Sequence, residues 1–128
     1  MIFGRQNIEI ADPAVLPYLT DAELIELYRT APVFCYPHTE PRHLHYSPLE
    51  AVTLGTPTLY FRGALMDTLL GGADLPAACA DTAEMAAKAR RLIGGDAALA
   101  EAIRSTQGRV LDAFDTDLAR RQWAAVLP

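Results

Sequence analysis

The stretch PVFCYPHTEPRHLHYSPLEAVTLGTPTLYF, residues 32–61, decides the fold. It holds two short apolar runs, PVFCYP and TPTLYF, each bounded by proline or glycine. Such runs are typical of buried strands in a parallel sheet. A polar turn and a helix separate them, and we expect this helix to run from Ser47 to Leu54 with Gly55 ending it. Strand, crossover helix and strand in this order predict a parallel pair.

The N-terminal side of this stretch carries a helix and a possible extra strand. Thr20 precedes DAELIELYRT, residues 21–30, whose apolar residues recur with a helical period. Glu23 lies three residues after Thr20, as in a capping box. Residues 7–10 alternate isoleucine with polar neighbours, which indicates a weak strand.

The C-terminal side continues with helices and one more strand. We expect a short helix over residues 64–70 and a third buried strand over residues 77–80. Asp81, with Glu84 three residues later, predicts the start of the next helix, and Asp96 begins a long one. The apolar residues predicted on these helices are Met85, Ala89, Leu92 and Ile93, then Leu99, Ile103, Val110, Leu111 and Phe114, and in a last helix Leu118, Trp123 and Val126.

This alternation predicts an α/β fold, an open, doubly wound, Rossmann-like parallel sheet with flanking helices. A chain of 128 residues corresponds to one domain. We expect a single unit over residues 1–128, with 1–18 irregular or forming the weak strand, 19–114 forming the α/β core and 115–128 forming a C-terminal helix.

Charge and composition narrow the class of protein. The net charge of −5 disfavours a general nucleic-acid binder, which normally shows a basic surface. No apolar run approaches the length of a membrane span, and the N-terminus lacks a signal-peptide pattern. We expect a cytoplasmic protein without a transmembrane segment. Peripheral association with the inner face of the membrane is compatible with this expectation. Cys35 and Cys79 lie in apolar segments, which predicts reduced core residues.

The turn before the second helix concentrates polar chemistry. Ser47 is expected as the N-cap, which places Glu50 three residues into the helix. Free backbone N–H groups and the helix dipole at such a start can hold a phosphate, and Arg42, His43 and His45 supply further donors. A carboxylate can accept two hydrogen bonds from a vicinal diol, so Glu50 suits a ribose.

Simpler interpretations remain open for these residues. Ser47 and Glu50 form a capping box with or without a ligand. His43 and His45 alternate around a leucine, as solvent-facing loop residues do. Two histidines at this spacing are a poor zinc set, so no metal is expected. The chain also lacks the glycine-rich loops of dinucleotide sites and P-loops, and the serine elbow of α/β-hydrolases.

Glu40, in the same turn, also has two interpretations. Its carboxylate can accept hydrogen bonds from a second hydroxylated ring. Alternatively, it can form a surface ion pair with Arg42, which would contribute little to stability.

The order and spacing of these segments resemble the C-terminal, donor-binding half of GT-B glycosyltransferases, in particular retaining enzymes of the group-1, family-4-like type. The similarity covers roughly residues 19–127. The residues that carry it are Leu24, Leu27 and Tyr28 in the first helix, 33–37 in the strand, and Glu50, Ala51, Gly55 and Pro57 in the second half.

The resemblance implies roles for individual residues. Glu50 corresponds to the glutamate that binds the donor ribose, and Glu40 to the catalytic glutamate beside the donor sugar. Nine residues separate these two, whereas the family has seven, so counting back from Glu50 places Arg42 at the first position. We expect an enlarged loop that keeps Glu40. The expected donor-binding residues are Glu50, Ser47, Tyr46, His45, His43 and Arg42.

The resemblance also implies a partner. In such enzymes, two Rossmann-like domains face each other across a cleft, and this chain resembles an incomplete second domain. We expect part of a glycosyltransferase that binds a nucleotide-diphosphate sugar without a metal or other cofactor. Transfer to an unknown acceptor needs the missing N-terminal domain or a partner chain. The alternative is a non-catalytic nucleotide- or protein-binding Rossmann-like module.

Overall fold

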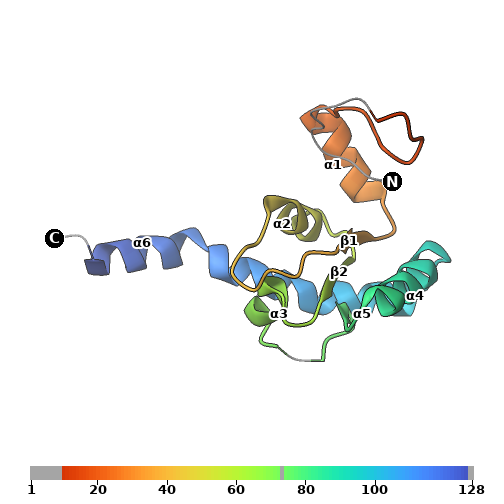
Figure 1. Ribbon diagram of the computed structural model, residues 1–128. Coiled ribbons are helices and arrows are strands. Elements are labelled where there is room, and N and C mark those ends of the chain that lie inside the picture. The colour runs from red at the N-terminus through yellow and green to blue at the C-terminus, as the bar shows by residue number, and fades with distance from the viewer. Residues whose placement is uncertain (1–9, 73, 127–128) are drawn as a thin grey trace.

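A small parallel sheet forms the centre of the molecule (Figure 1). The computed structural model describes residues 10–72 and 74–126. The strands are β1 (Phe34–Tyr36), β2 (Thr58–Phe61) and β3 (Ala78–Cys79), in the order β1-β2-β3. Cys35 is aligned with Leu59, and Tyr60 with Ala78, both in parallel pairs. The predicted open α/β class is confirmed, whereas the order of the described strands contains no reversal, so the doubly wound arrangement stays a prediction.

Helices flank this sheet. They are α1 (Asp21–Thr30), α2 (Tyr46–Thr53), α3 (Leu65–Leu69), α4 (Thr82–Ile93), α5 (Ala97–Gln107), the 3₁₀ helix η1 (Gly108–Phe114) and α6 (Thr116–Val126). α2 packs against β1, β2 and η1, and α4 packs against β2, β3 and α5. α1 contacts α2 on the outside of the body, and α6 projects away from it (Figure 1). Among the described residues, no helix has both the length and the apolar character needed to cross a membrane.

Two predicted helix starts are confirmed. The Thr20 hydroxyl accepts the Glu23 N–H at 3.3 Å, and the Glu23 carboxylate accepts the Thr20 N–H at 2.8 Å, which completes the capping box. The Asp81 carboxylate accepts the Glu84 N–H at 2.8 Å. These side chains satisfy N–H groups that have no partner within the helix.

The core is built around β2, all four residues of which are buried. Leu59 and Ile103 are fully buried in the same apolar cluster, which joins β2 to α5. Gln107 ends α5 with only 2% of its surface exposed. Its Oε1 accepts the Thr58 N–H at 3.0 Å, and its Nε2 donates to the Thr56 carbonyl at 3.0 Å. A side-chain amide therefore attaches the last turn of α5 to the beginning of β2.

The first strand differs from its prediction. β1 is an edge strand among the described residues, so the predicted fully buried strand is wrong: only Tyr36 is buried in it. Cys35 is consequently exposed, and the expectation that it belongs to the core is also wrong. Cys79, in β3, is buried as predicted, and both cysteines are free thiols.

The C-terminal helices also differ. The long helix predicted from Asp96 ends at Gln107, and the chain continues as η1, because Gly108 is a poor helix former. A 3₁₀ helix turns about 20° more per residue than an α-helix, which moves Phe114 off the apolar stripe. Phe114 is 52% exposed, and Ile93, predicted on an inner face, is 66% exposed at the end of α4. Of the weak strand predicted over 7–10, residues 7–9 lie outside the described part, and Ile10 is not in a strand.

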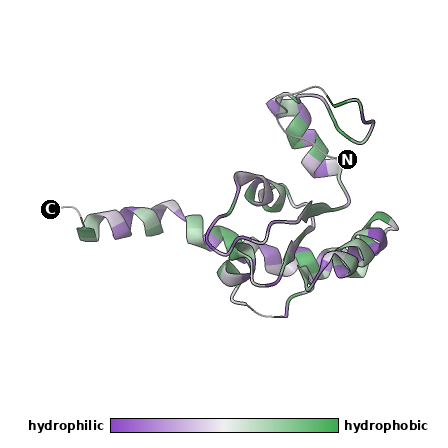
Figure 2. Cartoon of the chain, viewed as in Figure 1, coloured by the Kyte–Doolittle hydropathy of each residue, from purple (hydrophilic) through white to green (hydrophobic). Residues whose placement is uncertain are grey.

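The last helix carries apolar side chains without burying any. α6 contains no buried residue, and Trp123 and Val126 are exposed. Figure 2 shows apolar residues alternating with polar ones along this projecting helix. Its hydrophobic residues therefore contribute nothing to the core of the described chain.

Candidate functional site

The helix after the polar turn starts one residue earlier than predicted. Its N-cap is His45, which makes no side-chain capping bond, and Tyr46 is its first residue. The predicted N-cap at Ser47 is therefore wrong. Proline at the third helical position is tolerated because the first N–H groups of a helix have no internal acceptor. The early start is supported by the Tyr36 hydroxyl, which accepts the His45 N–H at 3.2 Å.

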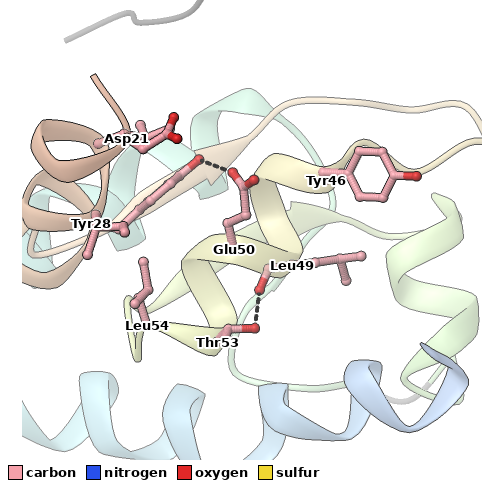
Figure 3. Close-up of a pocket in the computed structure, with 9 residues that line it drawn as sticks. Asp21, Tyr28, Tyr46, Leu49, Glu50, Thr53 and Leu54 are labelled. Carbon is pink, nitrogen blue, oxygen red and sulfur yellow. Dashed lines mark hydrogen bonds between the residues drawn. The ribbon is translucent and has the colours of Figure 1, made fainter. Parts of the chain in front are cut away.

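Glu50 does not complete a capping box; its carboxylate instead faces α1. The Tyr28 hydroxyl donates to Glu50 Oε2 at 3.4 Å, and Figure 3 shows the tyrosine reaching from α1 toward that carboxylate. Tyr28 is 2% exposed, whereas Glu50 is exposed. Burial raises the pKa of Tyr28 to about 12; the Ser47 side chain opposes this rise and the charge of Glu50 adds to it. The phenol therefore remains a proton donor that orients the carboxylate.

A hollow lies between α1 and α2, and Glu50 is on its wall (Figure 3). Its volume is about 550 Å³, within the range of small-molecule sites. Its lining includes Leu24, Ile25 and Tyr28 of α1 and Tyr46, Leu49 and Glu50 of α2. The apolar side chains can cover a flat ring, and the carboxylate can accept hydrogen bonds from hydroxyl groups on it.

Glu40 and Arg42 both lie exposed in the loop between β1 and α2. Glu40 Oε1 accepts the backbone N–H of Arg42 at 3.2 Å, so the carboxylate folds back on its own loop. The Glu40 carbonyl accepts the Leu65 N–H at 3.4 Å, which ties this loop to the start of α3. The structure thus gives Glu40 a fixed backbone position, and its catalytic role stays a prediction.

The histidines of the same loop form a cluster, and within it His43 and His45 are exposed to solvent, as one of the alternatives expected. The ring centroids are 4.6 Å apart for His43 and His45, 4.7 Å for His38 and His45, and 5.7 Å for His38 and His43. Tyr36 stacks on His38 and bonds to His45 Nδ1 at 2.9 Å. In the part of the chain that the structure describes, no three histidine, cysteine or carboxylate side chains are arranged to hold a metal ion.

The structure thus places the sequence-predicted residues in two neighbouring groups. Glu50 and Tyr46 line the hollow, while Arg42, His43 and His45 belong to the loop that enters α2. Ser47, half-buried, lies between these groups in the first turn of the helix.

Three contributing residues escaped the sequence analysis: Tyr28, Tyr36 and His38. The two tyrosines were counted as apolar residues of a helix and a strand. A buried tyrosine hydroxyl usually needs a hydrogen-bond partner, and this requirement is the signal that could have identified them. His38 follows β1 by two positions, at the edge of the sheet where ligands of α/β folds bind.

Comparisons with known proteins found no relative of this chain. No protein-family model, no curated protein and no solved structure matches the chain.

Proposed function

We propose that this chain is the nucleotide-diphosphate-sugar-binding part of a glycosyltransferase. Two observations support the proposal: the ordered motif between residues 24 and 57 that resembles GT-B donor domains, and the position of Glu50 on the wall of the hollow between α1 and α2. In this assignment the hollow takes the nucleoside, and the loop before α2 takes the diphosphate.

The position of Glu50 is the observation that carries the proposal. Its carboxylate is exposed on the wall of the hollow and is held by the Tyr28 hydroxyl through one of its two oxygens. A carboxylate has about four lone-pair sites, so both oxygens can still accept hydrogen bonds from a ligand. The two hydroxyls of a ribose match this acceptor pair.

The entry to α2 suits the leaving diphosphate. Its first backbone N–H groups have no acceptor within the helix, and the helix dipole places partial positive charge there. Arg42 and the loop histidines add donors. Together they stabilise the charge that develops on the diphosphate as the sugar leaves. Glu40, on the same loop, is assigned to the reacting sugar.

The proposal includes a second Rossmann-like domain or a partner chain that supplies the acceptor site. The position of β1 is consistent with this, because it is the outermost of the described strands on its side of the sheet. Exposed edge strands of soluble proteins are normally covered or blocked. A further strand of a complete donor domain can occupy that edge.

Calorimetry with a panel of nucleotide-diphosphate sugars tests the proposal. We expect the chain to bind one of them, and Glu50→Gln to weaken that binding at least about tenfold, because an amide nitrogen cannot accept a ribose hydroxyl. The matched control is Glu101→Gln, an exposed glutamate on α5. Affinity that is equal in Glu50→Gln and in the unaltered chain would contradict the assignment.

The second candidate is a non-catalytic module that binds another protein. The exposed Trp123 and Val126 of α6 favour it, because exposed aromatic side chains are enriched at interfaces. Absence of heat with every nucleotide sugar, together with assembly on another polypeptide that Trp123→Ala abolishes, would favour this candidate over the first.

A further inference from the structure

The chain has three histidines, and all of them lie in one cluster. They are His38, His43 and His45, in the loop between β1 and α2. Each imidazole contacts the other two, with ring centroids less than 6 Å apart. Positive charges this close repel one another, so protonation of one ring disfavours protonation of the others.

Tyr36 holds the cluster in place. Its ring stacks on His38 with centroids 5.4 Å apart, and its hydroxyl contacts both Nδ1 and the backbone N–H of His45. Burial raises the pKa of Tyr36, so the phenol keeps its proton. It can donate to Nδ1 of neutral His45 or accept from Nδ1–H of the cation, and the contact therefore survives a change of protonation.

In the free protein, the neutral state is favoured at His45 of this cluster. His38 Nδ1 is buried and has no hydrogen-bond partner. The pKa of His45 is lowered from its usual value of 6.5, first by desolvation of the ring and then by the charges of His43 and His38.

The carboxylates near the cluster do not set the pKa of His45. The titratable and charged groups on the surrounding segments are Cys35 and Tyr36 of β1, Glu40 and Arg42 of the loop, Tyr46 and Glu50 of α2, and Asp67 of α3. None of the carboxylates of Glu40, Glu50 and Asp67 is among the causes of the shifted pKa of His45. The other two imidazoles are the charged neighbours that act on His45.

We propose that His38, His43 and His45 form a single proton-sharing anion site, which takes up protons when a phosphate-like dianion binds beside the entry to α2. The dianion supplies the opposite charge that the cluster lacks, so the protonated rings become favourable in the complex. By linkage, affinity then rises as the pH falls, by up to about tenfold per pH unit for each proton taken up.

The stability of the free protein depends on pH in the opposite direction to its affinity for the anion. Because its pKa is lowered, folded His45 binds fewer protons than the unfolded chain does. The stability that it contributes is present above pH 6.5 and is lost as the pH falls through its lowered value. Acid therefore lowers the stability of the free protein at this cluster, whereas it strengthens binding of the anion.

A nuclear magnetic resonance titration of the imidazole protons tests the inference, since every histidine signal of the chain reports on the cluster. Curves are recorded from about pH 5 to about pH 8.5 in chloride and in sulfate at equal ionic strength, because sulfate stays dianionic over this range. We expect broad, coupled curves in chloride, with at least one pKa below 6.5, and an upward shift of the cluster in sulfate.

Substitutions distinguish proton sharing among the three imidazoles from simple attraction of the anion by any positive charge. His38→Gln is expected to raise the pKa of His45 in chloride and to shrink the shift that sulfate causes. His43→Gln, at an exposed position, serves as a second variant with the same expectation. Arg42→Gln removes a cation but no imidazole, so sulfate affinity should fall while its dependence on pH remains.

Independent titrations that are equal in chloride and sulfate would overturn the inference, as would sulfate shifts unchanged in both histidine variants. The inference rests on the proposed anion site, yet sulfate tests it without a nucleotide sugar. If no nucleotide sugar bound, the proposed function would be contradicted. The sulfate titration would still test the proton-sharing anion site.

Discussion

Replacing Ile103 by Ala is expected to lower the free energy of unfolding by about 3 kcal/mol, because it leaves a cavity where a fully buried side chain packs. Ile103 lies on α5 in the cluster that includes Leu59 of β2. The loss combines the removed apolar contacts with the cavity that the surrounding residues cannot fill. Urea unfolding monitored by circular dichroism measures it.

The same substitution at Ile93 is the matched control. Ile93 is 66% exposed at the end of α4, so Ile93→Ala should change the free energy of unfolding by less than about 0.5 kcal/mol. Equal losses at the two positions would contradict the packing of α5 against the sheet. A large loss at Ile93 alone would indicate that its side chain is covered in the folded protein.

Replacing Gln107 by Leu is expected to cost about 2–3 kcal/mol, the second large effect on stability. Leucine has similar bulk but leaves the Thr58 N–H, at the first residue of β2, without the acceptor that Gln107 Oε1 provides. A buried donor without a partner costs about 1–3 kcal/mol, and the bond to the Thr56 carbonyl is lost as well.

Gln122→Leu on α6 is the control for this change, since Gln122 is exposed. Its expected effect is within about 0.5 kcal/mol. If Gln107→Leu were as stable as the unaltered chain, the side-chain link between α5 and β2 would have no energetic importance. Amide hydrogen exchange at Thr58 gives a local measure, and the exchange should become faster in Gln107→Leu.

The sequence predicted the order of strands and helices because local signals are strong at those places. Thr20 with Glu23, and Asp81 as an N-cap, set two helix starts, and glycines with positive φ end others, such as Gly55 at φ 82°. The failures came from tertiary context. Whether Cys35 is buried depends on whether a strand lies outside β1, and local pattern carries no information about that.

The site was predicted in part for a similar physical reason. Ser47, Pro48 and Glu50 fit a capping pattern, but two contacts from outside the helix decide the geometry: the Tyr36 hydroxyl at its start and the Tyr28 hydroxyl at Glu50. Both tyrosines are distant in sequence from their partners. Spacing within one helix therefore identified the residues but not the contacts that orient them.

The measurement that tests the central claim most directly is a structure of the chain with the nucleotide sugar that it binds. The account predicts the ribose hydroxyls within hydrogen-bonding distance of the Glu50 carboxylate, and the diphosphate next to His45 at the beginning of α2. A ligand bound elsewhere, with the hollow between α1 and α2 empty, would contradict it.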